Sequence, residues 1–291
     1  MSPARIAVLT TLAMIAFAGN SLLCRVALKA TAIDAASFTT IRLLAGALVL
    51  ALAARLHRGA HGAGNWPSAL ALFAYAAGFS YAYVSLPAAS GALLLFGAVQ
   101  ATMIGYGLWR GERLGTAQLG GLGLAGAGLV ALLLPGLSAP PLAGALLMLG
   151  AGVAWGVYSL RGRGAGDPTH VTAGNFLRAV PIGIALSALT WAHRSLDGAG
   201  VGYAVASGAL ASGVGYAIWY TALPALKATS AATVQLSVPV IAAVGGIIFL
   251  GEPLTLRLLL ASAAILGGIA LVILNRRPAA GVPPAATSTN R

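Results

Sequence analysis

Side chains that could do acid, base or metal chemistry are few in this chain of 291 residues and lie far apart along it. The histidines are His57, His61, His170 and His193, and together with Cys24 they lack the close spacing of a metal site. The lone Cys24 cannot form an internal disulfide. No Ser/His dyad and no pair of acids falls within one apolar stretch, so the sequence indicates neither catalysis nor a bound metal, and no cofactor is expected.

Polar side chains inside apolar stretches are better suited to binding a solute. Phe17, Asn20 and Cys24 follow one another at i, i+3 and i+7, which places them on one face of a helix. The amide of Asn20 needs a hydrogen-bond partner in an apolar interior. That partner is either a solute or a neighbouring helix, and the sequence leaves both open.

Aromatic residues recur at helical spacing in three other stretches. Their rings could stack around a flat or apolar solute while their OH and NH groups bind its polar end. The alternative is an anchor at the membrane surface, which we expect of Tyr81 and Trp109. The candidates for lining a pathway are Tyr75, Phe79 and Tyr83, then Trp155 and Tyr158, and then Tyr216, Trp219 and Tyr220.

Two amides are also candidates, because Gln100 and Gln235 fall inside apolar stretches. Uncharged amides could bind the carboxylate and ammonium groups of a zwitterion, or could equally join two helices. Pro239, one turn beyond Gln235, removes a backbone hydrogen bond and can leave a carbonyl free to meet a solute.

Charged residues inside the apolar stretches are arginines. Arg42 and Arg178 either extend to the headgroups or hold an anionic group or a gate. Arg25 is closer to a boundary and is expected to reach the headgroups. Glu112 and Glu252 fall at helix ends, where they are expected to bind nearby backbone or loop donors. With no carboxylate in the middle of a stretch, a proton-coupling residue is not evident, which favours transport down a gradient.

The composition identifies the elements that must position these residues. About 59% of the chain is hydrophobic, only 8% is charged, and the mean hydropathy is +0.90, which is typical of an integral membrane protein. The apolar runs lack the alternation of barrel strands, so each is interpreted as a helix and the fold as all-α. Ten segments are expected, at 5–28, 35–56, 67–86, 90–109, 116–134, 141–160, 171–191, 199–223, 229–250 and 256–274.

The distribution of Lys and Arg predicts the orientation. With the N-terminus in the cytoplasm, the outer side has only Lys29, Arg194 and Arg257, and both termini are inside. The residues on the inner side are then Arg5, Arg55, Arg58, Arg110, Arg113, Arg161, Arg163, Lys227, Arg276, Arg277 and Arg291. This bias predicts a multi-pass protein of a bacterial-type inner membrane. A cleaved signal peptide, suggested by Ala16-Phe17-Ala18, is the alternative for the first segment.

The net charge of +12 does not indicate nucleic acid, because the cations are spread along the chain rather than gathered in a patch. The expected partners are a small-molecule solute and membrane lipid, with a monomer as the working assumption. The Gly121-Leu-Gly123-Leu-Ala-Gly126 match to a dinucleotide fingerprint lies in an apolar helix without a preceding strand, so close helix packing explains it better. The polar tail 275–291 is expected to be disordered.

The chain also repeats itself. Residues 13–134 align with 147–274. The aligned pairs include Phe17-Ala-Gly-Asn20 with Trp155-Gly-Val-Tyr158, Ile41-Arg42 with Leu177-Arg178, Leu86-Pro87-Ala88 with Leu223-Pro224-Ala225, and Gly111-Glu112 with Gly251-Glu252. Five helices per half is an odd number, so the second half is expected to be inverted in the membrane. Inverted repeats place a shared site near the midplane, which is typical of transporters.

These features resemble the drug/metabolite transporter superfamily, and specifically its EamA-domain family. The aromatic residues and the single-chain ten-helix form are most similar to the YddG-type aromatic amino-acid exporters. The resemblance implies two EamA-like five-helix repeats, 5–134 and 141–274, around a central cavity that exports small metabolites. One departure is Val99-Gln100, where the family often has proline and the second half has Pro239.

The leading hypothesis is therefore a membrane transporter, not an enzyme. It would export amino acids with aromatic or hydrophobic side chains by alternating access, as a facilitator or uniporter. A multidrug carrier would be expected to have an interior acid, and a sugar-phosphate-like carrier would be expected to have several cavity cations. Arg42 and Arg178 keep the second alternative open.

Overall fold

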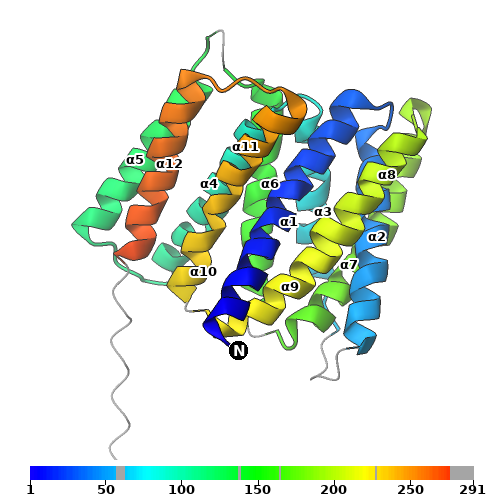
Figure 1. Cartoon of the computed structure of the whole chain (residues 1–291), viewed down its shortest axis with the longest axis horizontal. Helices are drawn as coiled ribbons and strands as arrows, with labels where there is room; N and C mark the ends of the chain where they lie inside the picture. The colour runs from blue at the N-terminus through cyan, green and yellow to red at the C-terminus, as the bar shows by residue number, and fades with distance from the viewer. Residues whose placement is uncertain (57–62, 137–138, 164, 227, 276–291) are drawn as a thin grey trace, which may run out of the picture.

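The computed structural model describes residues 1–56, 63–136, 139–163, 165–226 and 228–275, and every regular element in these ranges is helical (Figure 1). Large apolar side chains such as Leu189 and Phe249 are exposed along the outside of the bundle. Within the described ranges, nine helical segments are long and apolar enough to cross a membrane. Together these observations confirm an all-α integral membrane protein. Of the tail expected to be disordered, 275–291, Asn275 is described and follows the last helix, whereas residues 276–291 lie outside the described part.

In the first half of the chain the helices follow the expected segments closely. They are α1 (Pro3–Ala30), α2 (Ala35–Leu56), α3 (Trp66–Tyr83), α4 (Ala88–Trp109) and α5 (Thr116–Leu133). The 18-residue α3 is the one long helix of the described chain that is not among the nine apolar segments.

The second half departs from regular helices in two of its five segments. It contains α6 (Leu142–Arg161), α7 (Pro168–Leu189), α8 (Gly198–Ala206), a π-helical stretch η2 (Ser207–Val214), α9 (Gly215–Ala222), α10 (Ala228–Gln235), α11 (Ser237–Leu250) and α12 (Leu256–Leu274). The expected segment 199–223 is thus widened in its middle, where small residues predominate. The expected segment 229–250 breaks at Leu236, because Pro239 cannot donate to the preceding turn.

Three of the five acids are used to begin helices. Asp34, Asp167 and Asp197 accept backbone N–H groups in the first turns of α2, α7 and α8, at 2.9, 2.9 and 3.3 Å. Such caps satisfy donors that a helix cannot bond internally. These three carboxylates therefore lie at the helix ends and do not place a negative charge in the bundle interior.

The helices form one bundle in which α5 and α12 pair at one edge (Figure 1). Gly121 of α5 meets Gly268 of α12 so closely that a methyl group on Gly121 would lie 2.6 Å from the Gly268 carbonyl oxygen, whereas Gly123 and Gly126 have no neighbour within 4 Å. Gly121 therefore allows the close helix packing that we expected from the fingerprint-like motif.

We name the two ends of the bundle by the first helix. The N-terminal face is the end where α1 begins, and the far face is the end where α1 finishes at Ala30 (Figure 1). Because successive helices run in opposite directions, the connections 84–87 and 251–255 lie at the far face together with the end of α1, as their hydrogen bonds to Arg25 confirm. The connection 162–167 lies at the N-terminal face.

Candidate functional site

A cavity of about 350 Å³ lies among α1, α3, α4, α6, α7, α9 and α10. This volume is within the range of small-molecule sites, ~300–1,000 Å³. The lining includes eleven of the candidate residues from the sequence, namely Phe17, Asn20, Tyr75, Phe79, Gln100, Trp155, Tyr158, Tyr216, Trp219, Tyr220 and Gln235. The fold thus brings together side chains that are up to 218 positions apart in the sequence, from Phe17 to Gln235.

One wall of the cavity is a continuous cluster of aromatic rings centred on Trp155. Its ring lies 4.8 Å from that of Tyr75, 5.2 Å from that of Tyr158 and 5.5 Å from that of Tyr216, measured between centroids. Phe17 extends this wall from α1, with its centroid 5.6 Å from that of Tyr216. Such a wall offers both ring faces and ring edges to a planar or apolar solute.

Hydrogen bonds hold Asn20 at the centre of the bundle. Its amide nitrogen donates to the hydroxyl of Tyr75 at 3.3 Å, and its carbonyl oxygen accepts from the hydroxyl of Ser207 at 2.6 Å. Ser207 is the first residue of the π-helical stretch η2, and η2 packs against α1. The amide of Asn20 therefore joins helices, as one of the two alternatives from the sequence expected, and Asn20 also lines the cavity.

Arg42 is the most unusual charge near the cavity. Its side chain is only 1% exposed, and its Nε and Nη1 atoms have no hydrogen-bond partner among the described residues. The guanidinium carbon lies 5.2 Å from the ring centroid of Tyr75 and 4.8 Å from that of Phe79. Arg42 does not itself line the cavity, but it lies against two rings that do.

The structure places three other candidates away from the cavity. Tyr83 is completely buried, with its hydroxyl directed to the carbonyl of Ala88 at 3.3 Å. Arg178 donates to the carbonyls of Ala63 and Gly174, so it fastens the connection after α2 to α7. Cys24 is also completely buried and lines no part of the cavity. Helical spacing grouped Tyr83 and Cys24 with residues that line the cavity but could not show how far the cavity extends along each helix.

The expectation that Arg25 reaches the headgroups is wrong. Its side chain is buried, and its Nε donates to Oε1 of Glu252 at 3.1 Å. Its Nη1 donates to the carbonyls of Tyr83 and Val84 at 2.9 and 3.1 Å. The other oxygen of Glu252 accepts the backbone N–H of Ala88 at 2.8 Å. A buried ion pair with these additional hydrogen bonds therefore joins the two halves of the chain at the far face.

The cavity opens toward the N-terminal face. Gly162 and Arg163, at the end of α6, line the cavity and are exposed. In the opposite direction the lining ends at Phe79, and Tyr83, one turn further along α3, is completely buried. Arg163 and the small polar residues Ser21 and Thr172 also line the cavity but were not among the residues predicted from the sequence.

Comparison with known proteins identifies the class. Residues 142–274 match the model of the EamA-like transporter family. This part of the chain is therefore an EamA-like transporter domain. A solved crystal structure of 20% sequence identity shares the fold with a TM-score of 0.64 and covers 94% of this chain and 98% of its own.

The sequence is also similar to individual proteins. The chain is 60% identical over 278 residues to the uncharacterized protein PA1977 of Pseudomonas aeruginosa, covering 95% of this chain and 97% of that protein. Over 131 residues, it is also 40% identical to the threonine/homoserine exporter RhtA of Salmonella typhimurium and 38% identical to that of Escherichia coli. Each of these matches covers 43% of both chains.

Proposed function

We propose that this transporter exports amino acids with aromatic or hydrophobic side chains, as a facilitator that works by alternating access. The observation that carries this proposal is the aromatic cavity lying against the buried charge of Arg42. The rings suit a planar side chain, and a positive charge without an acidic neighbour in the lining favours a solute with a carboxylate.

The charge distribution disfavours the multidrug alternative. No acidic side chain lines the cavity within the described chain, whereas one exposed arginine, Arg163, stands at its mouth. A lipophilic cation would therefore enter a region of positive potential without a counter-charge. A sugar-phosphate would need more than one cation in direct contact, and Arg178 is already engaged with backbone carbonyls away from the cavity.

The similarity to RhtA supports an amino acid as the solute and raises a second candidate, a small hydroxyl amino acid. Asn20, Ser21 and Thr172 could bind a hydroxyl group in the lining. We favour the aromatic class because rings from α1, α3, α6 and α9 form much of the lining, and a short polar side chain would leave most of this apolar surface uncovered.

Alternating access by inverted repeats is supported by equivalent features in the halves 5–134 and 141–274. Gly111 and Gly251, which end the fourth helix of each half, both have positive φ, 87° and 61°. If α3 is counted beside the nine apolar segments, the described residues offer ten candidate crossings, the number that two five-helix repeats would require. The family model also begins and ends within a residue of the second repeat.

The described cations support a cytoplasmic N-terminus, since the N-terminal face has Arg5, Arg55 and the pairs Arg110/Arg113 and Arg161/Arg163, and the far face has Lys29, Arg194 and Arg257. In a bacterial inner membrane, the cavity would then be open to the cytoplasm, where an exporter loads its solute.

Reconstituted liposomes test this proposal. Radiolabelled phenylalanine, tryptophan, leucine, threonine and homoserine should be exchanged against the same unlabelled amino acid, with the aromatic solutes fastest. Uptake should follow the solute gradient and persist when a protonophore removes the proton gradient, because no acid among the described residues lines the cavity. Faster exchange of threonine than of phenylalanine would favour the second candidate, and loss of flux on addition of the protonophore would contradict the facilitator.

A further inference from the structure

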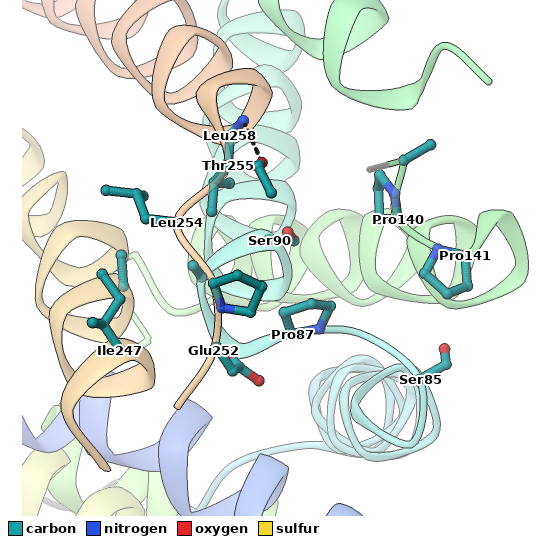
Figure 2. A pocket seen from close by; sticks show the side chains of 14 residues that line it. Ser85, Pro87, Ser90, Pro140, Pro141, Ile247, Glu252, Leu254, Thr255 and Leu258 are labelled. Carbon is teal, nitrogen blue, oxygen red and sulfur yellow. Dashed lines mark hydrogen bonds between the residues drawn. The ribbon is translucent and has the colours of Figure 1, made fainter. Parts of the chain in front are cut away.

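The Arg25–Glu252 pair separates two pockets. Besides the central cavity, a pocket of about 300 Å³ lies at the far face, lined by residues of α4, α11, the 139–141 connection and the turn before α12. Figure 2 shows Glu252 and Pro87 beside each other on its wall. From Glu252 the contacts continue inward to Arg25, whose Nη1 binds the carbonyl of Tyr83, and the ring of Tyr83 packs on that of Phe79, which lines the central cavity.

The internal repeat contains a second copy of both charges. A displacement of 138 positions places Phe17 on Trp155, and the same displacement places Arg25 on Arg163. The Gly-Glu dipeptide that ends the fourth helix of each half places Glu252 on Glu112. The existing ion pair joins the arginine of the first half to the glutamate of the second, so its repeat mate would join Arg163 to Glu112.

The backbone positions both glutamates in a similar way, with a hydrogen bond that spans five residues at Glu112 and six at Glu252. The N–H of Glu112 bonds the carbonyl of Gly107 and that of Glu252 bonds the carbonyl of Gly246, each at 3.0 Å. Each carboxylate also folds back over the same glycine, since a methyl group there would lie 2.6 Å from Glu112 Oε2 or 2.9 Å from Glu252 Oε2. Two turns 140 positions apart thus present a carboxylate at opposite ends of the bundle.

The helices that hold these residues also correspond. α1, which contains Arg25, packs against α11, which leads to Glu252, and α6, which leads to Arg163, packs against α4, which leads to Glu112. In the present conformation the first pair is closed and buried at the far face, whereas Arg163 stands exposed at the open mouth of the cavity. One end of the molecule is closed by its ion pair while the other end is open.

We propose that Arg163 and Glu112 form the ion pair that closes the N-terminal face when the Arg25–Glu252 pair opens. The two pairs are alternative gates: each is formed in one conformation only, and each conformation gains one buried pair and loses the other. Opening the first pair would join the far-face pocket to the central cavity. This inference rests on the alternating access that we propose above, but not on the identity of the solute.

Sided cysteine labelling tests the exchange without any solute. In full-length protein with Cys24→Ala, a single Val99→Cys in the lining of α4 reports access to the cavity. A charged, membrane-impermeant maleimide is applied to right-side-out and to inverted membrane vesicles, and the ratio of far-face to N-terminal-face labelling rates is measured. A failure of the proposed solute would leave these ratios unaffected.

The expected shifts have opposite signs. Glu252→Gln should raise the ratio and Glu112→Gln should lower it, each roughly tenfold or more, because removing one charge destabilises the conformation in which its partner would be buried. Arg163→Gln should behave as Glu112→Gln does, and it should fold normally because Arg163 is exposed in the present conformation. Arg161→Gln is the matched control, since Arg161 binds Ser68 and Asn65 of the α3 region and belongs to neither pair.

A purely structural role would not produce this pattern. If Glu112→Gln and Arg163→Gln leave the labelling ratio unchanged, or shift it in the same direction as Glu252→Gln, the second gate does not exist and the proposal is overturned. Opposite shifts, with an intermediate ratio in the Glu112→Gln/Glu252→Gln double variant and no shift for Arg161→Gln, support it.

Discussion

Replacing Arg42 by Met tests whether the buried charge selects the solute. Met preserves an unbranched apolar side chain against Tyr75 and Phe79 but removes the guanidinium. Two cation–π contacts are lost, each worth about 0.5–2 kcal/mol, while the desolvation penalty of an unpaired buried charge, several kcal/mol, is relieved. The variant should therefore fold at least as stably as the parent chain.

The effect on the solute follows from geometry. The guanidinium carbon lies about 5 Å behind the ring centroids of Tyr75 and Phe79. A carboxylate in contact with the cavity side of these rings would lie roughly 4 Å beyond them, hence about 9 Å from the charge. With an effective dielectric constant of ~20, the attraction is about 1.8 kcal/mol, equivalent to roughly a twentyfold change in affinity.

The assay compares an amino acid with its amide. Exchange in liposomes is measured for whichever amino acid of the panel is transported and for the corresponding amino-acid amide, which lacks the carboxylate. Arg42→Met should raise KM for the acid roughly twentyfold and leave the amide unchanged or improved. Arg178→Gln, the variant at the repeat mate, should keep the parental ratio of the two solutes. An unaltered ratio in Arg42→Met would refute the electrostatic role.

Three further variants test other parts of the structure. Trp155→Ala should raise KM for an aromatic solute roughly fivefold, from the loss of about 1 kcal/mol of ring stacking, and change threonine exchange little; equal effects on both solutes would argue against stacking. Asp34→Asn should lower the melting temperature in detergent at neutral pH. Burial raises the pKa of Asp34, but hydrogen bonds from Ser37 and from the backbone of Ser195 outweigh this and leave the pKa below its ordinary 3.8. The stability that Asp34 contributes is therefore complete above that value and lost as the pH falls through the lowered pKa, so the difference from Asn should vanish in acid, and a difference that persists there would contradict the assignment. Gly121→Val should destabilise the α5–α12 pair through contact with the Gly268 carbonyl, whereas Gly123→Val, whose site is open, should not.

The helical segments were predictable because hydrocarbon permits few alternatives. Their lengths and apolar character follow from the bilayer thickness and from the need to satisfy backbone hydrogen bonds within each segment. Local irregularities of the helices were harder to predict from the sequence. The π-helical stretch around Ser207 contains no proline, and its widening depends on contacts with α1 and α2 that form only in the tertiary structure. Pro239 indicated a break in this helix, but the sequence did not show that the break would lie three residues before it, at Leu236.

Most of the cavity lining was predictable for a related reason. Aromatic and amide side chains on one face of an apolar helix either meet each other or meet a cavity, and here they do both. The sequence could not distinguish the last turn of the lining from the layer behind it, so Tyr83 was grouped with Tyr75 and Phe79. It also assigned Arg25 to the headgroups, because the partner that makes its burial tolerable, Glu252, is 227 positions away.

The break in the second half bears on how a zwitterion would lie in the cavity. Pro239 has no N–H group, so it cannot donate to the carbonyl of Gln235 in the way that a residue four positions later normally does. Gln235 lines the cavity, so a residue whose carbonyl lacks its usual helical donor belongs to the cavity lining. At the corresponding place in the first half, α4 is continuous and contains Gln100 instead of proline. A carbonyl attracts an ammonium group, and Arg42, behind Tyr75 and Phe79, attracts a carboxylate. For the zwitterionic solute that we propose, these opposite attractions from α10 and the α2–α3 region predict a preferred direction of the solute dipole across the cavity, with its side chain at the rings around Trp155.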